Sequence, residues 1–586
     1  QPTEHQYFVT ETIAEIAALD RRLPSIADRD GEYYLRQEGQ GLLVGAYERN
    51  MKFWAEDGTP AGFGHELFAD DLERIEENML RAIDRVPAIG EAGIKRVING
   101  PMIWSPDANV LFGPVPELRN YFACNGIIPG FSQSGGMGLM AAQWIVEGET
   151  QYDMFAWDMA RFGDWADKAF TKARVRDSYA HRFSIHFPNE ERAAGRPVRT
   201  RPVHDIQKDM GAVMGLSYGW EHPLWFADSP GVVDTNGFTR QNWWGPVGDE
   251  CRMLRDHAGI IDISNFAKYR CKGPGAGAWL DAIFANNMPR EVGRSCLTPL
   301  IGKRGGIAGD FTVTRLGQDE FWIIGSGIAE RYHQRFFNAV PLPEATSFES
   351  QTVEVCGFNV AGPQSRAMLQ RLTNTSLETV DFPFMRSKRI ELAGVDCLVL
   401  RVSFTGDLGW ELHCATGDQQ RLYTALIEAG RDFGAGPVGS RALMSLRVEK
   451  GYGSWSREYS PEYWPQEVGL ARLCKMDKDF LNKDAVAQTL ANEPREQLVL
   501  LALDAADIDA SNADATGGEP IFRDGQGVGR VTSGAYGYSV GMSLALGYVK
   551  GVGPGDAVEV MVLGRPHKAR ILAEPPFDPK GQRLRG

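Results

Sequence analysis

The sequence predicts a multidomain α+β protein whose last part is a small all-β barrel or sandwich, and three observations support this. The chain of 586 residues is too long for one hydrophobic core, since domains usually hold about 100 to 200 residues. A strand that runs into Gly-Pro and then into a helix occurs twice, at 269–284 and 358–372, which predicts a pseudo-twofold α+β domain. From residue 497 onward, alternating apolar runs are separated by Gly and Asp-Gly turns, as in small barrels.

The first part of the chain combines strands with a helix. Strand-like runs at 7–10, 33–36 and 41–47 predict part of a mixed sheet. Apolar residues at steps of three and four over 67–86 predict an amphipathic helix that ends before Pro87.

A Gly-rich stretch at 130–138 precedes a helical run at 139–146. Backbone N–H groups gathered at a Gly-rich helix start can bind an anion or the polar edge of a cofactor. The same pattern also occurs in plain chain reversals, and the residues alone favour neither interpretation.

The segment 151–209 is rich in Arg, Asp and Lys and has few long apolar runs, which is typical of a surface connector between two bodies. The chain is therefore expected to divide into four parts, at 1–150, 151–209, 210–490 and 491–586.

The repeated unit also contains a sequence that imitates a dinucleotide-binding fingerprint. In the stretch that begins at Gly273, the third Gly, Gly277, comes too early for Gly-x-Gly-x-x-Gly, and no suitably placed acid follows the next strand. Since the unit recurs at Gly362, we interpret it as structural.

Composition narrows the class of protein. The balance of 62 Lys and Arg against 76 Asp and Glu leaves a net charge of −14, which disfavours non-specific binding to nucleic acid or anionic membranes. No apolar run approaches the roughly 18 residues of a membrane span, and we expect no leader because no basic and then apolar stretch opens the chain. The eight cysteines never form Cys-x-x-Cys, so we expect reduced interior thiols and no metal site.

The clearest candidate for chemistry is Asp310, within the segment 305–315. Small residues precede it, and alternating residues after it predict a half-buried strand. We expect this carboxylate at a Gly-rich bend that opens directly into a rigid strand. A turn acid that bonds its own backbone amides would have the same pattern.

A second candidate is the segment 404–413. It contains Phe404, a Gly-containing turn, and then Trp410 and Glu411 on a strand. A stacking ring and a carboxylate that accepts two hydrogen bonds suit a flat nitrogen heterocycle. The spacing of these residues is equally compatible with a role in packing the hydrophobic core.

A third candidate joins His5, Tyr33 and Arg36 with the Gly-rich stretch at 130–138. Together they would supply an imidazole, a phenol and a cation for a small zwitterionic substrate beside a cofactor. The spacing of these residues is at least as compatible with a structural role as with a role in binding or catalysis.

These motifs, with 33–38 and Thr532-Ser-Gly534, follow an order that closely resembles the dimethylglycine dehydrogenase and sarcosine dehydrogenase family, nearly from end to end. Family members join a flavin amine-oxidase domain to a folate domain similar to the glycine-cleavage T-protein. The resemblance implies a partial amine-oxidase domain over 1–150, a T-protein-like folate domain over 210–490 and a β-barrel over 491–586.

The resemblance also implies roles for individual residues. His5 and Tyr33 would be catalytic in the amine pocket, and Asp310 would be catalytic in the folate domain. FAD would contact Phe131, Ser132, Gln133, Ser134, Gly135 and Gly136. Tetrahydrofolate would be held by Asp310, Phe311, Thr312, Phe404, Glu411, Leu412 and His413, with Arg472 where relatives often carry a folate-contacting aromatic residue.

The chain departs from the family at its start. Relatives begin with a Rossmann segment that carries Gly-x-Gly-x-x-Gly and the histidine linked covalently to FAD, whereas this chain opens at Gln1, almost directly in a strand. We therefore expect it to hold only the isoalloxazine side of FAD. A second polypeptide or a cleaved segment would carry the Rossmann part, and loss of the amine-oxidase function is the remaining explanation.

The resemblance implies a flavin-dependent oxidoreductase that removes a methyl group from dimethylglycine and gives 5,10-methylenetetrahydrofolate. Sarcosine or another N-methyl amino acid is an alternative substrate, and a folate-dependent aminomethyltransferase with a non-catalytic N-terminal part is an alternative function. A purely structural subunit is disfavoured because Asp310 and Glu411 are both present. We expect a cytoplasmic location, or the mitochondrial matrix in a eukaryote; the residues do not indicate the electron acceptor.

Overall fold

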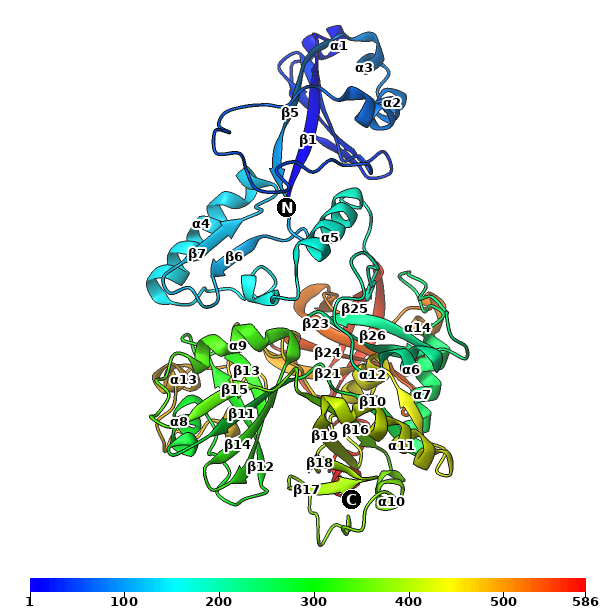
Figure 1. Ribbon diagram of the computed structural model, residues 1–586. Coiled ribbons are helices and arrows are strands. Elements are labelled where there is room, and N and C mark those ends of the chain that lie inside the picture. Colours follow the sequence, from blue (N-terminus) through cyan, green and yellow to red (C-terminus); the bar gives the residue numbers. More distant parts are fainter. The chain divides into compact units, whose positions relative to one another are not determined.

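The computed structural model describes residues 1–586, which form two compact units (Figure 1). The first unit contains residues 1–141, 156–186 and 192–198, and all other residues belong to the second. None of the helices combines the length and the apolar character that crossing a membrane requires.

The first unit is built on a five-stranded sheet in the order β2-β3-β4-β1-β5. Every neighbouring pair is antiparallel, so the expectation of a mixed sheet is wrong. Short connections between β2, β3 and β4 favour antiparallel pairing, because a parallel pair needs a long crossover. The strands are β1 (Pro2–Thr10), β2 (Ile26–Asp28), β3 (Tyr33–Glu38), β4 (Gly41–Ala46) and β5 (Ile94–Ile103).

Helices cover one face of this sheet. Ile75 and Ala82 belong to the same buried cluster as Phe8, Tyr33 and Val44 of the strands. The helical region starts later than expected, because Phe68 forms an isolated bridge with Asn99 and is extended. The helices are α1 (Ala14–Ala17), η1 (Leu72–Ile75), α2 (Glu76–Arg85) and α3 (Ala88–Glu91); the small hairpin β6 (Leu111–Pro114) and β7 (Phe122–Asn125) follows.

The Gly-rich stretch at 130–138 is helical and is not a loop. It forms the first half of α4 (Gly130–Glu147). No atom lies within 4 Å of a Cβ built on Gly135 or Gly136, so neither crowding nor a left-handed backbone requires glycine there. The chain turns earlier, at Gly126, whose φ is 69°.

Regular structure also occurs within 151–209, where composition indicated a surface connector. α5 (Lys168–Ala180) begins after Asp167, whose carboxylate accepts a hydrogen bond from the Phe170 N–H. Val175 and Tyr179 are fully buried in the first unit. The short helices η2 (Met159–Arg161) and α6 (His204–Asp209) flank this region.

Two sheets with matching strand order form the body of the second unit, and they confirm the pseudo-twofold α+β domain. Their orders are β12-β13-β14-β11-β15 and β17-β18-β19-β16-β10-β20. In each, one strand leads through Gly-Pro and a helix into a three-stranded meander. The first sheet contains β11 (Ala267–Lys272), β12 (Ser295–Ile301), β13 (Ile307–Gly317), β14 (Glu320–Gly325) and β15 (Ser347–Ser350). The second contains β10 (Gly259–Asp262), β16 (Val355–Ala361), β17 (Ser387–Leu392), β18 (Val395–Leu400), β19 (Gly409–Ala415) and β20 (Gly436–Val438).

The two Gly-Pro turns have the same structural cause. Gly273 and Gly362 have φ values of 128° and 119°, and an added Cβ would lie 2.3 Å and 2.2 Å from a backbone oxygen of another segment. Only glycine tolerates both conditions. The helices α8 (Ala276–Ile283) and α10 (Ser365–Gln370) follow, which supports a structural interpretation of the fingerprint-like sequence.

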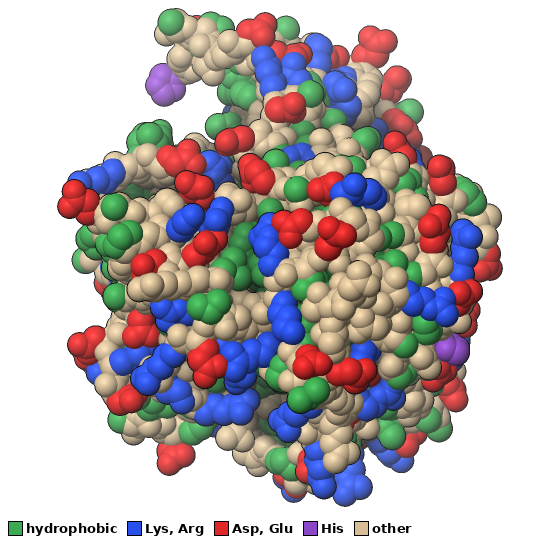
Figure 2. All heavy atoms as spheres, turned by 60° about the horizontal axis from the view of Figure 1, so that its bottom comes forward, with side chains coloured by type: hydrophobic (Ala, Val, Ile, Leu, Met, Phe, Trp, Pro, Cys, Tyr) green, Lys and Arg blue, Asp and Glu red, His purple; other side chains and the backbone are tan.

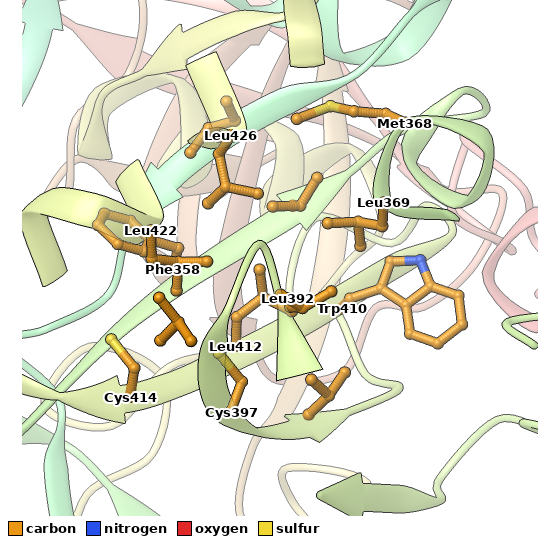
Figure 3. Packing of buried hydrophobic residues seen from close by; sticks show 14 of the residues in the cluster. Phe358, Met368, Leu369, Leu392, Cys397, Trp410, Leu412, Cys414, Leu422 and Leu426 are labelled. Carbon is orange, nitrogen blue, oxygen red and sulfur yellow. The ribbon is translucent and has the colours of Figure 1, made fainter. Parts of the chain in front are cut away.

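Each sheet buries one face against its own helices. Phe358, Trp410 and Leu412 of the second sheet pack with Met368 of α10 and Leu422 of α11 (Gln419–Arg431) (Figure 3). The first sheet packs similarly against α8 and α9 (Glu330–Phe337). The opposite faces of the two sheets meet each other, because Trp322 and Ile324 of β14 share a buried cluster with Leu398 and Leu400 of β18.

The C-terminal part is a closed barrel, which is one of the two folds that the alternating runs predict and the one that the resemblance implies. Its strands follow the order β21-β24-β23-β22-β25-β26. Alternate residues such as Val531, Ala545 and Val560 form its core. The strands are β21 (Gln497–Leu503), β22 (Pro520–Arg523), β23 (Gln526–Gly537), β24 (Met542–Val549), β25 (Ala557–Val562) and β26 (Arg565–Leu572).

Surface charge and cysteines agree with the composition. On the face in Figure 2, Lys and Arg side chains are interspersed with Asp and Glu side chains, so this face offers no purely basic surface. All eight cysteines are free thiols, and Cys124 alone is exposed. Burial raises the pKa of buried thiols such as Cys271, to about 12, which keeps them protonated.

Candidate functional site

Asp310 lies within a strand and is not at the bend. It is the fourth residue of β13 and pairs with Pro299 of β12; the bend comes before it, at Gly305, whose φ is 81°. The side chain is half-buried. Burial raises the pKa of this carboxyl to about 6, so it can hold or release a proton near neutral pH.

Residue 306, just before β13, must be glycine because another segment of the chain passes very close to its backbone. A Cβ on Gly306 would lie 1.8 Å from the backbone oxygen of Pro461. The Ile307 N–H donates to the Tyr463 carbonyl at 3.0 Å. The start of β13 is therefore joined to the loop at residues 452–463.

Strand alternation separates the residues around Asp310. Phe311 points into the core of the first sheet and packs against Phe284, His333 and Phe337. Its side chain is therefore part of the hydrophobic core. Thr312 shares the face of Asp310, since successive side chains alternate, and it pairs with Ile324 of β14. Of these neighbours, Thr312 is the one that faces the second sheet.

Glu411 and His413 occupy the facing side of the second sheet. They lie on β19, directly opposite Leu400 and Leu398 of β18, which contact β14 of the first sheet. Leu412 points the other way, into the helix-covered core, because successive side chains of a strand point to opposite faces. Its side chain therefore does not face the inter-sheet space. Asp310 and Thr312 of the first sheet and Glu411 and His413 of the second therefore face the same inter-sheet space.

Several buried polar atoms at this interface have no partner in the protein. Both ring nitrogens of His413, the indole nitrogen of Trp322 and the amide oxygen of Asn359 make no hydrogen bond. The His413 Nε2 is 3.6 Å from a Glu411 oxygen, and the His413 ring centroid is 5.9 Å from that of Trp322. Burial lowers the pKa of His413, which keeps the imidazole neutral. Unsatisfied buried groups are costly, so this donor and acceptor set fits a flat polar heterocycle such as the pterin of tetrahydrofolate.

Phe404 and Arg472 lie at the margins of this arrangement. The Phe404 ring stacks on Tyr452, with centroids 6.0 Å apart and an interplanar angle of 22°. Arg472 is exposed on η5 (Ala471–Leu473). This short helix lies against β12 of the first sheet.

The sequence reasoning missed the loop at residues 452–463. Tyr452 stacks on Phe404, Trp455 packs 5.1 Å from the ring of His333, and Tyr459 is close enough to Asp310 that burial and then this carboxylate raise its pKa. The signal was present as a run of regularly spaced aromatic residues in a Pro- and Gly-containing segment.

Glu458 holds this loop on the barrel. Its buried carboxylate accepts hydrogen bonds from Thr532 and Ser533 of β23, at 2.8 Å and 2.5 Å, and from the Ser454 N–H. Arg447 of α12 (Ser440–Glu449) completes the cluster at 2.8 Å from Glu458. The Thr532-Ser-Gly534 motif therefore has a structural role, because it positions the loop that lies beside Asp310.

In the first unit, His5 is joined to Tyr34 and not to Tyr33. The His5 Nε2 lies 3.2 Å from the Tyr34 hydroxyl, and Nδ1 lies 3.0 Å from the Tyr179 hydroxyl. The Tyr47 ring packs 4.7 Å from His5. Burial and then the charge of Arg74 lower the pKa of His5 to about 4.

Tyr33 belongs to the opposite face of β3. It is fully buried in the sheet–helix core, and its hydroxyl donates to Asp28 at 3.2 Å. A strand directs successive side chains to opposite faces, so Tyr33 does not lie beside His5, and Tyr34 is the tyrosine of this pair that meets it. Arg36 shares the Tyr34 face but is exposed and pairs with Glu38 at 2.8 Å.

The residues implied for FAD lie in the first turns of α4. Phe131 is fully exposed. The Ser132 hydroxyl donates to the carbonyl of Pro129, just before the helix, and the Ser134 hydroxyl donates to the carbonyl of Phe131. The open Gly135 and Gly136 and the N-terminal N–H groups of a long helix fit the polar edge of a flavin.

Comparisons with known proteins cover both units. Residues 1–144 match the FAD dependent oxidoreductase model and 147–200 its central domain. Residues 203–478 match the GCVT N-terminal domain, and 497–578 match the glycine cleavage T-protein C-terminal barrel domain.

Two relatives match almost the whole chain. The mitochondrial dimethylglycine dehydrogenase of Mus musculus is 37% identical over 98% of this chain and 67% of the relative. The mitochondrial sarcosine dehydrogenase of Homo sapiens is 31% identical over 99% of this chain and 68% of the relative. The structure of glycine cleavage system aminomethyltransferase T from Bartonella henselae aligns with a TM-score of 0.56 at 22% identity, covering 65% of this chain and 98% of that one. This last similarity concerns the fold.

Proposed function

Because the chain belongs to the family of dimethylglycine and sarcosine dehydrogenases, we propose that it oxidatively demethylates dimethylglycine and transfers the one-carbon unit to tetrahydrofolate. It is a flavin-dependent oxidoreductase with FAD and tetrahydrofolate as cofactors. The proposed product is 5,10-methylenetetrahydrofolate. The observation that carries the proposal is that the half-buried Asp310 faces the same inter-sheet space as His413, whose two ring nitrogens make no hydrogen bond.

The amine site prepares the substrate for hydride loss. Bound FAD supplies the hydride acceptor, and residues 131–136 would hold its polar edge. Only the uncharged amine has the lone pair that drives hydride loss. The neutral His5 accepts a hydrogen bond from Tyr34, whose oxygen can then accept an N–H from the substrate.

The inter-sheet site handles the one-carbon unit. Tetrahydrofolate, when bound, supplies the nitrogen nucleophiles. Asp310 would orient the reacting nitrogen and hold or move its proton, because the pKa of this carboxyl is raised to about 6 by burial. Glu411 would accept two pterin N–H groups, and His413 and Trp322 would complete the polar contacts.

Asp310→Asn tests this division of labour. Dye-linked oxidation of dimethylglycine is expected to stay within about twofold of wild type, while the product shifts from methylenetetrahydrofolate to free formaldehyde, since loss of a proton-transfer group costs about 10²-fold or more in its own step. Both products are measured in one reaction. Asp319→Asn, on an exposed turn after the same strand, is the matched control. Equal loss of both outputs would refute the assignment.

Two alternatives remain within this fold. Sarcosine or another N-methyl amino acid replaces dimethylglycine if it reduces the flavin with the higher kcat/KM. A folate-dependent aminomethyltransferase with a non-catalytic N-terminal part predicts a colourless protein that still binds tetrahydrofolate. Visible absorbance of the purified protein separates the transferase from the dehydrogenases.

The chain spans about two thirds of the length of the relatives it matches. We propose that polypeptide outside these residues binds the adenosine and pyrophosphate of FAD, either as a second subunit or as a cleaved or adjoining segment; the mass of the native complex distinguishes these. Free thiols and relatives named as mitochondrial support a reducing compartment, either the cytoplasm or the mitochondrial matrix.

A further inference from the structure

We propose that the proton lost by the substrate's ammonium group passes through Tyr34, His5 and Tyr179 to the buried carboxylate of Glu48. This inference rests on the proposed oxidation of an N-methyl amino acid. It assigns the internal acceptor of the proton, which that function leaves open.

Four side chains of the first unit form a continuous line of hydrogen bonds. The Tyr34 hydroxyl is 3.2 Å from His5 Nε2, and His5 Nδ1 is 3.0 Å from the Tyr179 hydroxyl. Tyr179 donates to a Glu48 oxygen at 3.2 Å. The line therefore runs from β3 through β1 and α5 to Glu48, the second residue after β4.

The hydrogen bonds have one direction. Tyr179 has a single proton and donates it to Glu48, so its oxygen must accept from the Nδ1–H of His5. The neutral imidazole then has a bare Nε2, which accepts from the Tyr34 hydroxyl. Every donor points toward Glu48, as a one-way proton relay requires.

The surroundings of Glu48 allow it to accept a proton and later return it. Tyr179 is fully buried, and Glu48 is 2% exposed. Burial raises the pKa of Glu48 to about 7, although Arg74, at 3.2 Å, opposes this. The titratable and charged groups around it are Glu4 and His5 of β1, Asp71 and Arg74 at η1, Tyr179 and Arg182 at α5 and the turn after it, and the adjacent Tyr47.

The transfer balances. The substrate N–H bond breaks as its proton moves to the Tyr34 oxygen, and the Tyr34 proton moves to His5 Nε2. The His5 Nδ1 proton moves to the Tyr179 oxygen, and the Tyr179 proton forms an O–H bond on Glu48. Each relay residue ends neutral, the amine is uncharged, and Glu48 has changed from carboxylate to carboxylic acid.

Difference infrared spectroscopy of the flavoprotein tests the relay. At about pH 8, Glu48 is ionised before substrate binds, so adding dimethylglycine is expected to produce the carbonyl stretch of a protonated carboxylic acid. Glu48→Gln should abolish this band. Tyr179→Phe should also abolish it, because the line is interrupted, and should slow flavin reduction by about 10²-fold.

Tyr121→Phe, on an exposed tyrosine of the same unit, is the matched control and should keep the band. Tyr179→Phe removes one oxygen only, so it serves if Glu48→Gln does not fold. The relay is refuted if the band is missing in wild type while the flavin is reduced, or if it persists in Tyr179→Phe. Failure of every N-methyl amino acid to reduce the flavin would instead overturn the proposed function.

Discussion

At the scale of single residues, burial sets the charge of the groups on which the proposed chemistry depends. It raises the pKa of Asp310 to about 6 and that of Glu48 to about 7. It also lowers the pKa of His5 to about 4, with help from Arg74. Carboxyl groups that change charge near neutral pH, beside an imidazole that stays neutral, are suited to proton transfer.

Asp310→Asn is expected to stabilise the second unit at neutral pH. The pKa of Asp310 is about 6 when folded and near 3.8 when unfolded, so the folded state binds the proton more tightly and loses stability as the pH rises from about 4 to 6. Asparagine has no charge to bury. The unfolding free energy of Asp310→Asn should therefore exceed that of wild type by an amount that grows as the pH rises from about 4 to 6. After allowance for the partial exposure of the side chain, the difference should reach about 2 kcal/mol.

Urea unfolding at about pH 4 and pH 8 measures this effect. An advantage of the same size at both pH values would mean that the charge of Asp310 is not the cause.

The neighbouring tyrosines Tyr33 and Tyr34 should behave oppositely when changed to phenylalanine. Tyr34→Phe removes the hydroxyl that bonds to His5, so kcat/KM for the amine should fall by about 10² with little change in Tm. Tyr33→Phe removes a hydrogen bond to Asp28 in the core and should cost about 1 kcal/mol of stability with kcat/KM unchanged. Steady-state kinetics and thermal unfolding of both variants decide this; the reverse pattern would restore Tyr33 to the pocket.

At the scale of elements, the inter-sheet site depends on two features. Side chains alternate between the two faces of each strand, and the loop at 452–463 passes close to the start of β13. Alternation along β13 and β19 sends Asp310 and Glu411 toward the facing sheet and sends Phe311 and Leu412 into the helix-covered cores. The loop at 452–463 completes this region because Gly306 lets Pro461 approach the start of β13.

Gly306→Ala is expected to displace that loop. Its new Cβ would lie 1.8 Å from the Pro461 oxygen, so the backbone must move, and tetrahydrofolate binding should weaken by tenfold or more, about 1.4 kcal/mol. Calorimetric titration measures the affinity, and dye-linked amine oxidation should not change.

Gly245→Ala is the control, since no atom lies within 4 Å of its added Cβ. Normal folate affinity in Gly306→Ala would show that the loop does not shape the site.

At the scale of the whole molecule, the chain consists of two compact units, and each contains one of the two proposed sites. The hydrogen-bond line from Tyr34 to Glu48 lies in the first unit, whereas Asp310, Glu411 and the loop at 452–463 lie in the second. Ligands of one site should therefore stabilise one unit selectively.

Tetrahydrofolate is expected to raise the Tm of the second unit alone. At about 100 times its Kd, a ligand adds about 2.7 kcal/mol to the unit that binds it, which corresponds to a shift of a few degrees. Scanning calorimetry with and without tetrahydrofolate shows whether one transition moves. Equal shifts of all transitions would indicate that the units unfold together.

Sequence periodicity was sufficient for most elements of the fold. The two-residue alternation after residue 497 predicted a small all-β barrel or sandwich, and the repeated Gly-Pro turns at Gly273 and Gly362 predicted the pseudo-twofold domain, because both patterns are local. Local patterns failed at two places: the Gly-rich stretch at 130–138 is helix, and Asp310 lies inside its strand.

The two-part chemistry could be predicted from the amino-acid sequence: the order of its motifs resembles that of a flavin amine oxidase joined to a folate domain, and this resemblance implied roles for His5, Asp310 and Glu411. The partners that these residues meet could not be predicted in this way, because they depend on how the chain folds. Tyr34 faces His5, and Tyr179 reaches His5 from 174 residues away in the chain. Such contacts arise where the faces of sheets meet and where distant segments cross. A shift of one residue in strand register would turn every side chain to the opposite face, so different side chains would then meet.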